Sequence, residues 1–138
     1  MKQEDLCYRW LNAGDAEMVN DWLKGWKKNS LDVGMYPETG LVLFNQTDET
    51  PVYAGFVWIP NTSNMAMIGF VTRNPFYKKK LPKNTREKFL NMLIWLCKEL
   101  GKEYVITWTD NQALVSDFKK LGLTETSNKC SELLAKII

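Results

Sequence analysis

Apolar and polar positions along the chain follow two different spacings, which divide it into strand-like and helix-like segments. Short apolar runs rich in β-branched and aromatic residues, separated by polar turns, predict strands, and apolar residues at helical spacing predict helices. Strands are expected at residues 6–11, 41–44, 52–59, 65–72, 103–109 and 130–138, and helices at residues 15–26, 84–100 and 110–121. Residues 133–135 also fit a helix. The order predicts one α+β domain spanning residues 1–138, with a central mixed, mostly antiparallel sheet flanked by helices.

Residues that commonly begin and end helices stand at the expected boundaries. Aspartate and asparagine side chains accept hydrogen bonds from the first free N–H groups, and glycine adopts the left-handed backbone that ends a helix. The expected first residues are Asp15, Asn84 (in a capping box with Glu87) and Asp110, and the expected last ones are Gly101 and Gly122. These signals support the three helices independently of their apolar stripes.

Six tryptophans are many for a chain of 138 residues. Four of them stand within apolar stripes, which predicts a place in the core. These four are Trp22, Trp26, Trp95 and Trp108. Trp10 and Trp58 are freer, and they are candidates for contact with a protein partner because tryptophan is favoured at the centres of interfaces.

Composition excludes several classes of protein. With 45% hydrophobic and 25% charged residues the chain has the balance of a globular domain. Its longest apolar run, Met92 to Cys97, is far shorter than a membrane span requires, and its first residues lack the apolar stretch of a signal peptide. Three cysteines without a C-x-x-C spacing cannot all pair, so a reduced, cytoplasmic protein is expected.

The chain contains no histidine. This removes the Ser-His and Cys-His nucleophiles and every metal site that depends on imidazole. Magnesium bound by carboxylates alone is compatible with the composition, but aspartate and glutamate do not cluster in a suggestive way. No metal is therefore expected.

Positive charge is concentrated in one short segment. Residues 78–88 contain six basic residues and one acidic residue, whereas the whole chain has a net charge of only +2. The remainder is therefore mildly acidic. Such a basic cluster predicts either an anionic partner that binds at one place or a solvated lysine loop. Nucleic acid is an unlikely partner, because it is usually bound by a broader basic face interleaved with aromatic residues.

The order of elements, together with two local matches, resembles the GNAT superfamily of acetyl-CoA-dependent N-acetyltransferases. The firmer match follows the fifth strand and is similar to the family's spaced Asn, Ala, Tyr, Lys, Gly and Phe. Its residues are Asp110, Asn111, Leu114, Phe118, Lys120, Leu121, Gly122 and Leu123. The second match follows the fourth strand and precedes a helix. Its residues are Val71, Pro75, Tyr77 and Lys78.

The sequence departs from the family at two points. Leu81 and Lys83 stand where the family has phosphate-binding glycines, and Pro82 between them has no N–H to donate. Either lysine side chains hold the phosphates in place of backbone amides, or the site has been lost. Phe118 replaces the tyrosine that often protonates the leaving thiolate in the family. Loss of such an acid slows a reaction by a factor of about 10² to 10⁴.

The resemblance implies an acetyl-CoA site between the fourth and fifth strands, with an amine acceptor entering beside Tyr36, Glu38 and Tyr53. The implied coenzyme-binding residues are Ile68, Phe70, Val71, Lys78, Lys79, Lys80, Lys83, Arg86, Asn111 and Phe118. Glu38 and Tyr36 are the candidate bases and Tyr77 is the candidate acid. Asp110, Tyr104 and bound water are alternatives for these steps.

A narrower group suggests a different role. Small internal virion proteins of short-tailed phages have a GNAT-like shape, a similar length and a glycine-poor loop. The similar segments here are residues 70–72, 86–89 and 108–111, with Phe118 and Gly122. Under this interpretation the chain is a non-catalytic structural protein that binds a protein partner and is located in the phage particle.

Overall fold

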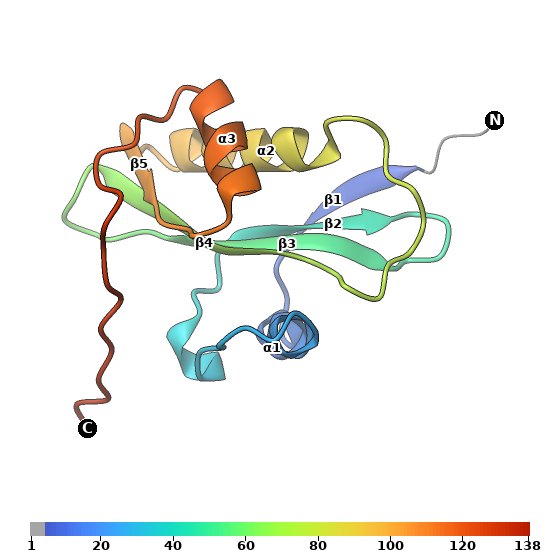
Figure 1. Ribbon diagram of the computed structural model, residues 1–138, viewed down its shortest axis with the longest axis horizontal. Coiled ribbons are helices and arrows are strands. Elements are labelled where there is room, and N and C mark those ends of the chain that lie inside the picture. The colour runs from blue at the N-terminus through green and yellow to red at the C-terminus, as the bar shows by residue number, and fades with distance from the viewer. Residues whose placement is uncertain (1–4) are drawn as a thin grey trace.

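The structure, a computed structural model, describes residues 5–138 of the chain (Figure 1). The strands are β1 (Leu6–Trp10), β2 (Gly40–Asn45), β3 (Pro51–Trp58), β4 (Met65–Arg73) and β5 (Tyr104–Thr107). The helices are α1 (Asp15–Gly25), α2 (Thr85–Glu99) and α3 (Gln112–Lys120), with a short 3₁₀ turn η1 (Val33–Met35). These elements confirm the α+β class.

The strands form one sheet in the order β1-β2-β3-β4-β5. Neighbouring strands from β1 to β4 are antiparallel, and β5 runs parallel to β4. A parallel neighbour requires a crossover, and helix α2 supplies it between β4 and β5. The sheet is therefore mixed and mostly antiparallel, as the sequence predicts.

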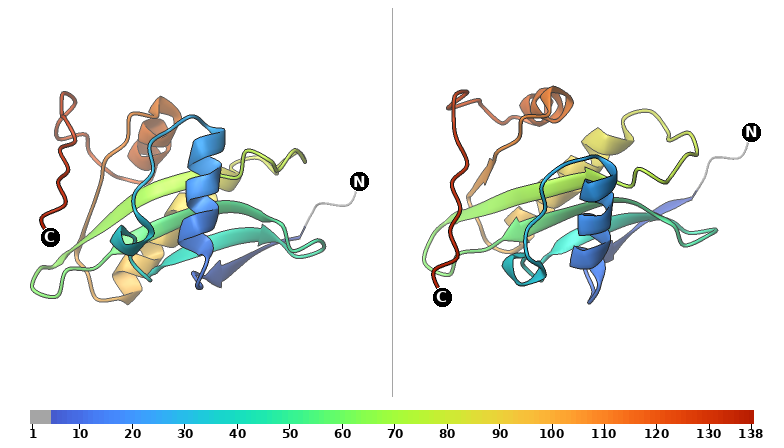
Figure 2. Two further views of the ribbon diagram at one scale, coloured as in Figure 1. Left: turned by 90° about the horizontal axis from the view of Figure 1, so that it is seen from below. Right: turned by 60° about the horizontal axis from the view of Figure 1, so that its bottom comes forward.

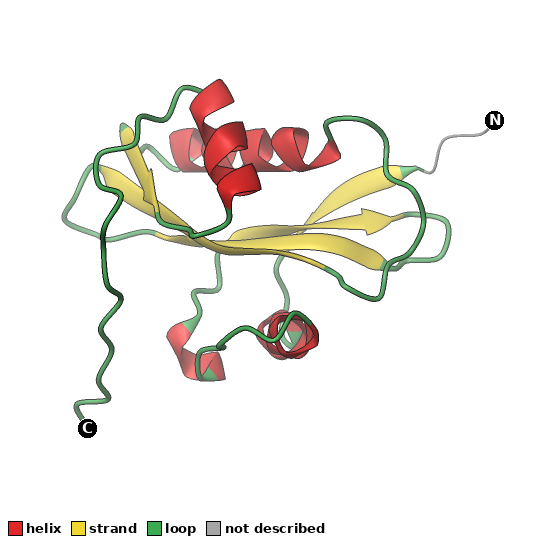
Figure 3. Ribbon diagram, viewed as in Figure 1, coloured by secondary structure: helices red, strands yellow, loops and turns green. Residues whose placement is uncertain are grey.

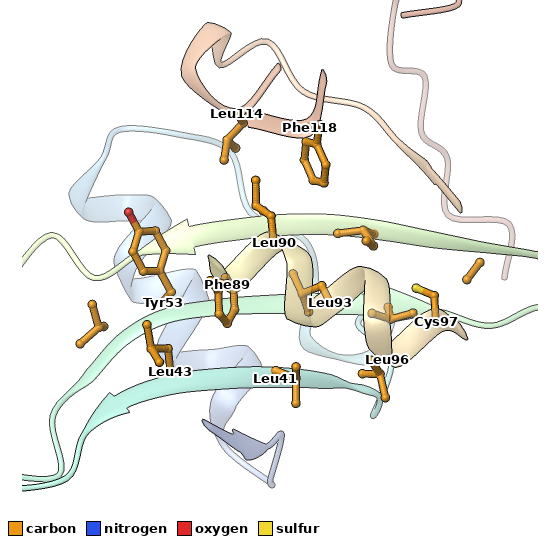
Figure 4. Close-up of a cluster of buried hydrophobic side chains, with 14 of the residues drawn as sticks. Leu41, Leu43, Tyr53, Phe89, Leu90, Leu93, Leu96, Cys97, Leu114 and Phe118 are labelled. Carbon is orange, nitrogen blue, oxygen red and sulfur yellow. The ribbon is translucent and has the colours of Figure 1, made fainter. Parts of the chain in front are cut away.

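Helices cover both faces of the sheet. Figures 1 and 3 show α2 and α3 on one face, and Figure 2 shows α1 lying across the other. The larger core cluster lies beneath α2 and α3, with Phe89, Leu90 and Leu93 fully buried (Figure 4). The smaller cluster lies beneath α1 and includes Val19 and Phe56. Because β3 and β4 are buried on both faces, their sequences read as nearly continuous apolar runs.

Gly55 in β3 sets how closely α2 approaches the sheet. A Cβ atom at this position would lie 2.6 Å from the Leu93 side chain and 3.3 Å from that of Phe89. Only a residue without a side chain allows these leucine and phenylalanine side chains to rest on the strand backbone. The close packing of α2 therefore depends on a glycine in the middle of a strand.

The helices end as predicted but begin differently. Gly101 and Gly122 have positive φ angles of 82° and 103°, which confirms their role at the ends of α2 and α3. Helix α1 begins at Asp15, and the residue before it, Gly14, has no side chain to cap it. Asp15 does not cap it through its side chain in the predicted way, because this buried carboxylate binds Arg9.

The cap of α3 is Asn111 rather than Asp110. The Asn111 side chain accepts hydrogen bonds from the N–H groups of Ala113 (3.0 Å) and Leu114 (3.3 Å). Asp110 lies one residue too early to reach these donors. The prediction at this boundary was wrong by one residue.

Residues 130–138 form no strand, and the prediction of a last strand is wrong. Leu133 is 91% exposed and Ile138 is fully exposed, so these side chains do not pack on the rest of the chain. A strand needs a paired neighbour, and the segment lies away from the sheet (Figures 1 and 2). The backbone of residues 130–138 therefore pairs with no strand of the sheet.

Three of the tryptophans expected in the core are half exposed instead. Trp22 is buried as predicted, but the exposed fractions of Trp26, Trp95 and Trp108 are 47%, 45% and 47%. Helical spacing predicts which side chains lie on the apolar face of a helix. It does not predict how much of that face a neighbouring element covers. The Trp26 indole N–H donates to the Arg73 carbonyl at 2.7 Å, so this side chain links the end of α1 to the end of β4.

No helix in residues 5–138 combines the length and the apolar character that crossing a membrane would require.

We expect Cys97 to be the least reactive of the three cysteines. Burial raises the pKa of its thiol from 9.0 to about 11, whereas Cys7 is partly exposed and Cys130 is exposed. Ellman's reagent at mildly alkaline pH should therefore label Cys130 first, Cys7 next and Cys97 only when the protein unfolds. The contribution of Cys97 to the free energy of unfolding is constant below about pH 9 and falls between about pH 9 and 11, because the unfolded thiol ionises first.

A chain carrying Cys7→Ser and Cys130→Ser isolates this thiol. Labelling of that folded variant as fast as free cysteine would contradict the buried position of Cys97.

Candidate functional site

Strands β4 and β5 run side by side for only part of their length. Pairing extends from Met65 with Tyr104 to Ile68 with Thr107, and there β5 ends. Strand β4 continues to Arg73, so its residues 69–73 have no strand beside them on the β5 side. The Thr107 hydroxyl donates to the Ile68 carbonyl at 2.7 Å and closes the paired region. The two strands therefore part at Ile68, where the sequence resemblance implies the acyl donor.

A bulge in β4 marks the same point. The register between β3 and β4 shifts between Ala54 and Phe56, and Phe70 has a positive φ of 52°. A bulge places an extra residue in one strand and bends it locally. The Phe70 ring packs on the α1 face against Tyr36, with 5.4 Å between ring centroids, so the bend is held by aromatic contacts.

Helix α2 begins without a side-chain cap. Asn84 precedes the helix in the left-handed conformation (φ 65°), and its side chain makes no capping hydrogen bond, which contradicts the predicted capping box. The first hydrogen bond of the helix runs from the Lys88 N–H to the Asn84 carbonyl at 3.0 Å. The N–H groups of Arg86 and Glu87 therefore point out of the helix start without a carbonyl one turn back.

A groove of about 280 Å³ opens at this helix start. Its walls come from the ends of β3 and β4, the loop before α2, the first turn of α2, and α3. The lining residues are Tyr53, Arg73, Leu81, Pro82, Asn84, Thr85, Arg86, Glu87, Asp117 and Lys120. The groove therefore lies at the end of β4, next to the stretch of that strand that β5 does not pair.

The groove carries one more positive than negative side chain. Arg73, Arg86 and Lys120 face the two carboxylates of Glu87 and Asp117. The Arg86 Nε atom donates to the buried Asp117 carboxylate at 2.5 Å, which raises the pKa of Arg86 and fixes its guanidinium group. One edge of that group is therefore positioned by the protein, and its remaining N–H donors are held in a defined direction.

Tyr53 forms the floor of this cluster. Its side chain is buried, which raises the pKa of its hydroxyl, and the nearby positive charges of Arg73 and Arg86 oppose the rise. The ring stacks on Phe89 with 5.6 Å between centroids. The Tyr53 ring therefore packs on Phe89 of α2, and its hydroxyl lies close to Arg73 and Arg86.

The loop lysines do not line the groove. Lys78, Lys80 and Lys83 are not among its lining residues, and the Lys79 ammonium group lies 3.1 Å from the Asp48 carboxylate in the turn between β2 and β3. Of the basic residues expected to meet phosphate, Arg86 alone is among the lining residues of this groove in the described part of the chain. The binding roles of these lysines stay predictions.

The three candidate catalytic residues do not gather in one place. The Tyr36 hydroxyl donates to the Asn20 side chain at 2.6 Å on the α1 face, and burial raises its pKa. Glu38 is exposed in the loop before β2. Tyr77 is buried in the cluster on the α2 side of the sheet, where its hydroxyl accepts a hydrogen bond from Asn45 at 3.2 Å. Their catalytic roles stay predictions.

Two residues of the firmer family match have structural tasks. The Asn111 side-chain oxygen caps α3, and Phe118 is buried and points toward Leu90 (Figure 4). Neither task requires a ligand.

Sequence reasoning missed Arg73, Lys120 and Tyr53 as groove residues. The sequence predicts Tyr53 only as a neighbour of the amine acceptor. It includes Lys120 only as part of the motif that resembles the family. The signal for Arg73 was its position as the charged residue that ends a buried strand.

No group of three or more potential metal ligands occurs among residues 5–138.

No protein-family model and no curated protein matches the sequence. Solved structures match its shape. Glucosamine-6-phosphate N-acetyltransferase from Arabidopsis thaliana matches 96% of this chain over 100% of its own, with a TM-score of 0.64 and 15% identity. Rv2747 from Mycobacterium tuberculosis, in complex with CoA, matches 91% of this chain over 76% of its own, with a TM-score of 0.70 and 13% identity.

N-acetylglutamate synthase from Neisseria gonorrhoeae, complexed with coenzyme A and N-acetyl-glutamate, matches 88% of this chain over 28% of its own. Its TM-score is 0.65 and its identity is 12%. At these identities the likeness is one of fold. The chain has the fold of the GNAT N-acetyltransferases, the family that its sequence resembles.

Proposed function

We propose that the chain is an N-acetyltransferase that moves an acetyl group from acetyl-CoA to an amine. The observation that carries this proposal is the groove at the start of α2, where an uncapped helix start meets Arg73, Arg86 and Lys120. Helix N-termini and guanidinium groups are two common means by which proteins bind phosphate. The similar structures solved with CoA support the same assignment.

The groove suits the phosphates of the coenzyme rather than the whole molecule. Its volume of about 280 Å³ lies at the lower end of small-molecule sites. The free N–H groups of Arg86 and Glu87 would donate to phosphate oxygens in place of the glycine amides that this loop lacks. Arg73 and Lys120 would neutralise the charge from the two sides of the gap.

The thioester would then lie along β4 where the strand is unpaired. A deprotonated amine attacks the carbonyl carbon, a C–N bond forms and the C–S bond breaks. The tetrahedral oxyanion needs an N–H donor, and residues 69–73 have backbone without a strand neighbour on that side. The nitrogen loses a proton as the amide forms, and since Phe118 has no acid proton, water would carry that proton to the leaving thiolate.

The acceptor would approach from the α1 face. Phe70 is in ring contact with Tyr36 and Trp58 there, and Glu38 lies in the exposed loop before β2. In the proposed arrangement Glu38 would remove a proton from the incoming ammonium group. The acceptor amine itself is not defined by these residues.

Arg73→Gln should weaken the binding of coenzyme A by about 10-fold or more, because a charge-assisted hydrogen bond contributes about 1.5–3 kcal/mol. Titration calorimetry with coenzyme A measures the dissociation constant. The matched control is Lys78→Gln with Lys80→Gln, which removes more positive charge from the loop and should change the constant by less than about 3-fold.

Two outcomes would overturn the assignment of the groove. The first is that the native chain gives no heat at millimolar coenzyme A. The second is that the lysine control loses as much affinity as Arg73→Gln. Transfer itself is tested by mass spectrometry of a panel of primary amines incubated with acetyl-CoA.

A second candidate function is that of a non-catalytic binding protein. The exposure of Trp10, Trp95 and Trp108 favours it, since large exposed aromatic side chains mark protein interfaces. Under this alternative the chain would transfer no acetyl group to any amine of the panel.

A further inference from the structure

The end of helix α1 and the loop that follows β4 lie against each other. A Cβ atom on Gly25 would lie 2.9 Å from the Pro75 side chain and 3.4 Å from the Phe76 ring. One residue further along, the Trp26 indole N–H donates to the Arg73 carbonyl at 2.7 Å. The fold therefore joins two segments that are 47 residues apart in the sequence.

Both of these segments are basic. Residues 24–28 and 73–80 together contain seven basic residues and no acidic residue, so the rest of the chain has a net negative charge. All seven basic side chains are on exposed residues. They are Lys24, Lys27, Lys28, Arg73, Lys78, Lys79 and Lys80. Contact between the two segments therefore gathers into one surface the positive charge of two separate parts of the chain.

Acidic side chains from elsewhere neutralise only part of this charge. The Lys79 ammonium group lies 3.1 Å from the Asp48 carboxylate, and that of Lys28 lies 3.9 Å from the Asp110 carboxylate. The Asp110 side chain is 97% exposed, so solvent screens this longer pair. The surface therefore keeps a net positive charge, which is complementary to a partner with several negative charges.

Two aromatic rings lie among the basic residues. Phe76 is 68% exposed and Trp26 is 47% exposed, and the hydrogen bond of the indole fixes one edge of the Trp26 ring. Neither segment contains leucine, isoleucine, valine or methionine, the aliphatic residues that usually help a surface to enter a membrane. Exposed rings surrounded by lysines are typical of surfaces on which nucleobases stack. We term the seven basic residues and these two rings the basic aromatic face.

We propose that the basic aromatic face binds single-stranded nucleic acid, with bases stacked on Trp26 and Phe76 and phosphates paired with the surrounding lysines. The basic cluster at residues 78–88 is by itself too narrow for nucleic acid, which is why the sequence predicts no such partner. The end of α1 supplies the missing breadth, with three more lysines and a tryptophan. The proposal is independent of the acetyltransferase assignment, because neither ring lines the groove at the start of α2.

The first test measures the contribution of charge by fluorescence anisotropy with a labelled oligothymidylate of about 15 nucleotides. The native chain should bind it, and the affinity should fall roughly 20- to 50-fold between about 50 and 200 mM salt when three or four phosphates are paired. Lys24→Gln with Lys27→Asn should bind about 5-fold more weakly or worse at the lower salt concentration. Asparagine is used at position 27 because Lys27 has a positive φ of 57°.

The matched control for charge is Lys98→Gln with Lys136→Gln. It removes the same charge from exposed positions on α2 and in the C-terminal segment, and it should bind the oligothymidylate like the native chain. Equal losses for the two double variants would show that only the net charge of the chain matters, and they would overturn the proposal.

The second test separates base stacking from insertion into a membrane. Phe76→Leu keeps an apolar side chain but removes the ring, so the oligothymidylate should bind about 5-fold more weakly or worse. Trp95→Ala, which removes an exposed ring from α2, should bind it like the native chain. Native-like binding by Phe76→Leu overturns the stacking. So does a native chain that binds vesicles of phosphatidylserine and phosphatidylcholine but not the oligothymidylate at low salt.

Discussion

Replacing Phe89 by alanine should lower the free energy of unfolding by about 3–5 kcal/mol, the range for deleting a buried aromatic ring. Phe89 is fully buried in α2 and stacks between Tyr53 and Tyr8, with centroid separations of 5.6 and 6.3 Å. Its ring also lies over the glycine at position 55, where no side chain can move in to fill the space. Urea denaturation followed by circular dichroism measures the change.

Trp95→Ala is the control on the same helix. It removes a larger side chain, but that side chain is 45% exposed, so the expected loss is about 1 kcal/mol or less. Equal losses for the two variants would show that size rather than burial decides the cost. They would contradict the position of Phe89 between sheet and helix.

Arg9→Met should cost about 3 kcal/mol, because it leaves a buried carboxylate without its counter-charge. The Arg9 guanidinium binds both oxygens of Asp15, at 2.8 and 3.0 Å, and the Asp15 side chain is only 5% exposed. The Asn12 N–H donates to the same carboxylate at 2.7 Å. This pair joins β1 to the start of α1.

The double variant Arg9→Met with Asp15→Asn tests the reason for the loss. An amide oxygen still accepts the Asn12 hydrogen bond, and no buried charge remains, so much of the lost stability should return in urea denaturation. A double variant less stable than Arg9→Met alone would show that the carboxylate stabilises α1 by another route. Lys79→Met, which removes the exposed pair with Asp48, should lower the stability far less than Arg9→Met does, because solvent screens an exposed ion pair.

The order of the elements was predictable because it depends on local patterns. Strands β2, β3 and β4 lie in the middle of the sheet, so their apolar runs and the polar turns between them identify them directly. The glycines that end α2 and α3 act through their own backbone angles, and no distant residue changes that preference.

The beginnings of the helices were less predictable because a capping side chain has competitors. The Asp15 carboxylate binds Arg9 through both of its oxygens and also accepts the Asn12 N–H. Asn84 adopts a left-handed backbone that turns its side chain out of capping position. Such outcomes depend on the tertiary neighbours of the residue, which the sequence around the helix start does not contain.

The basic cluster predicts an anion site at the loop before α2, and that site stays a prediction. A groove lies beside this loop, but most of its charged residues come from elsewhere in the chain. The side chains that line it, Arg73 and Lys120, come from a strand end and from a helix distant in sequence. Only the tertiary packing of α3 on α2 brings them to one groove.

The hydrogen bond from the Trp26 indole to the Arg73 carbonyl has a consequence for communication across the sheet. It fastens the end of α1, on one face of the sheet, to the residue that ends β4 and lines the groove. Under the proposed transferase function, a shift of α1 when an acceptor docks would pull on the same backbone that positions the Arg73 side chain. The affinities for coenzyme and acceptor would then be thermodynamically linked, each changing the other by the same factor.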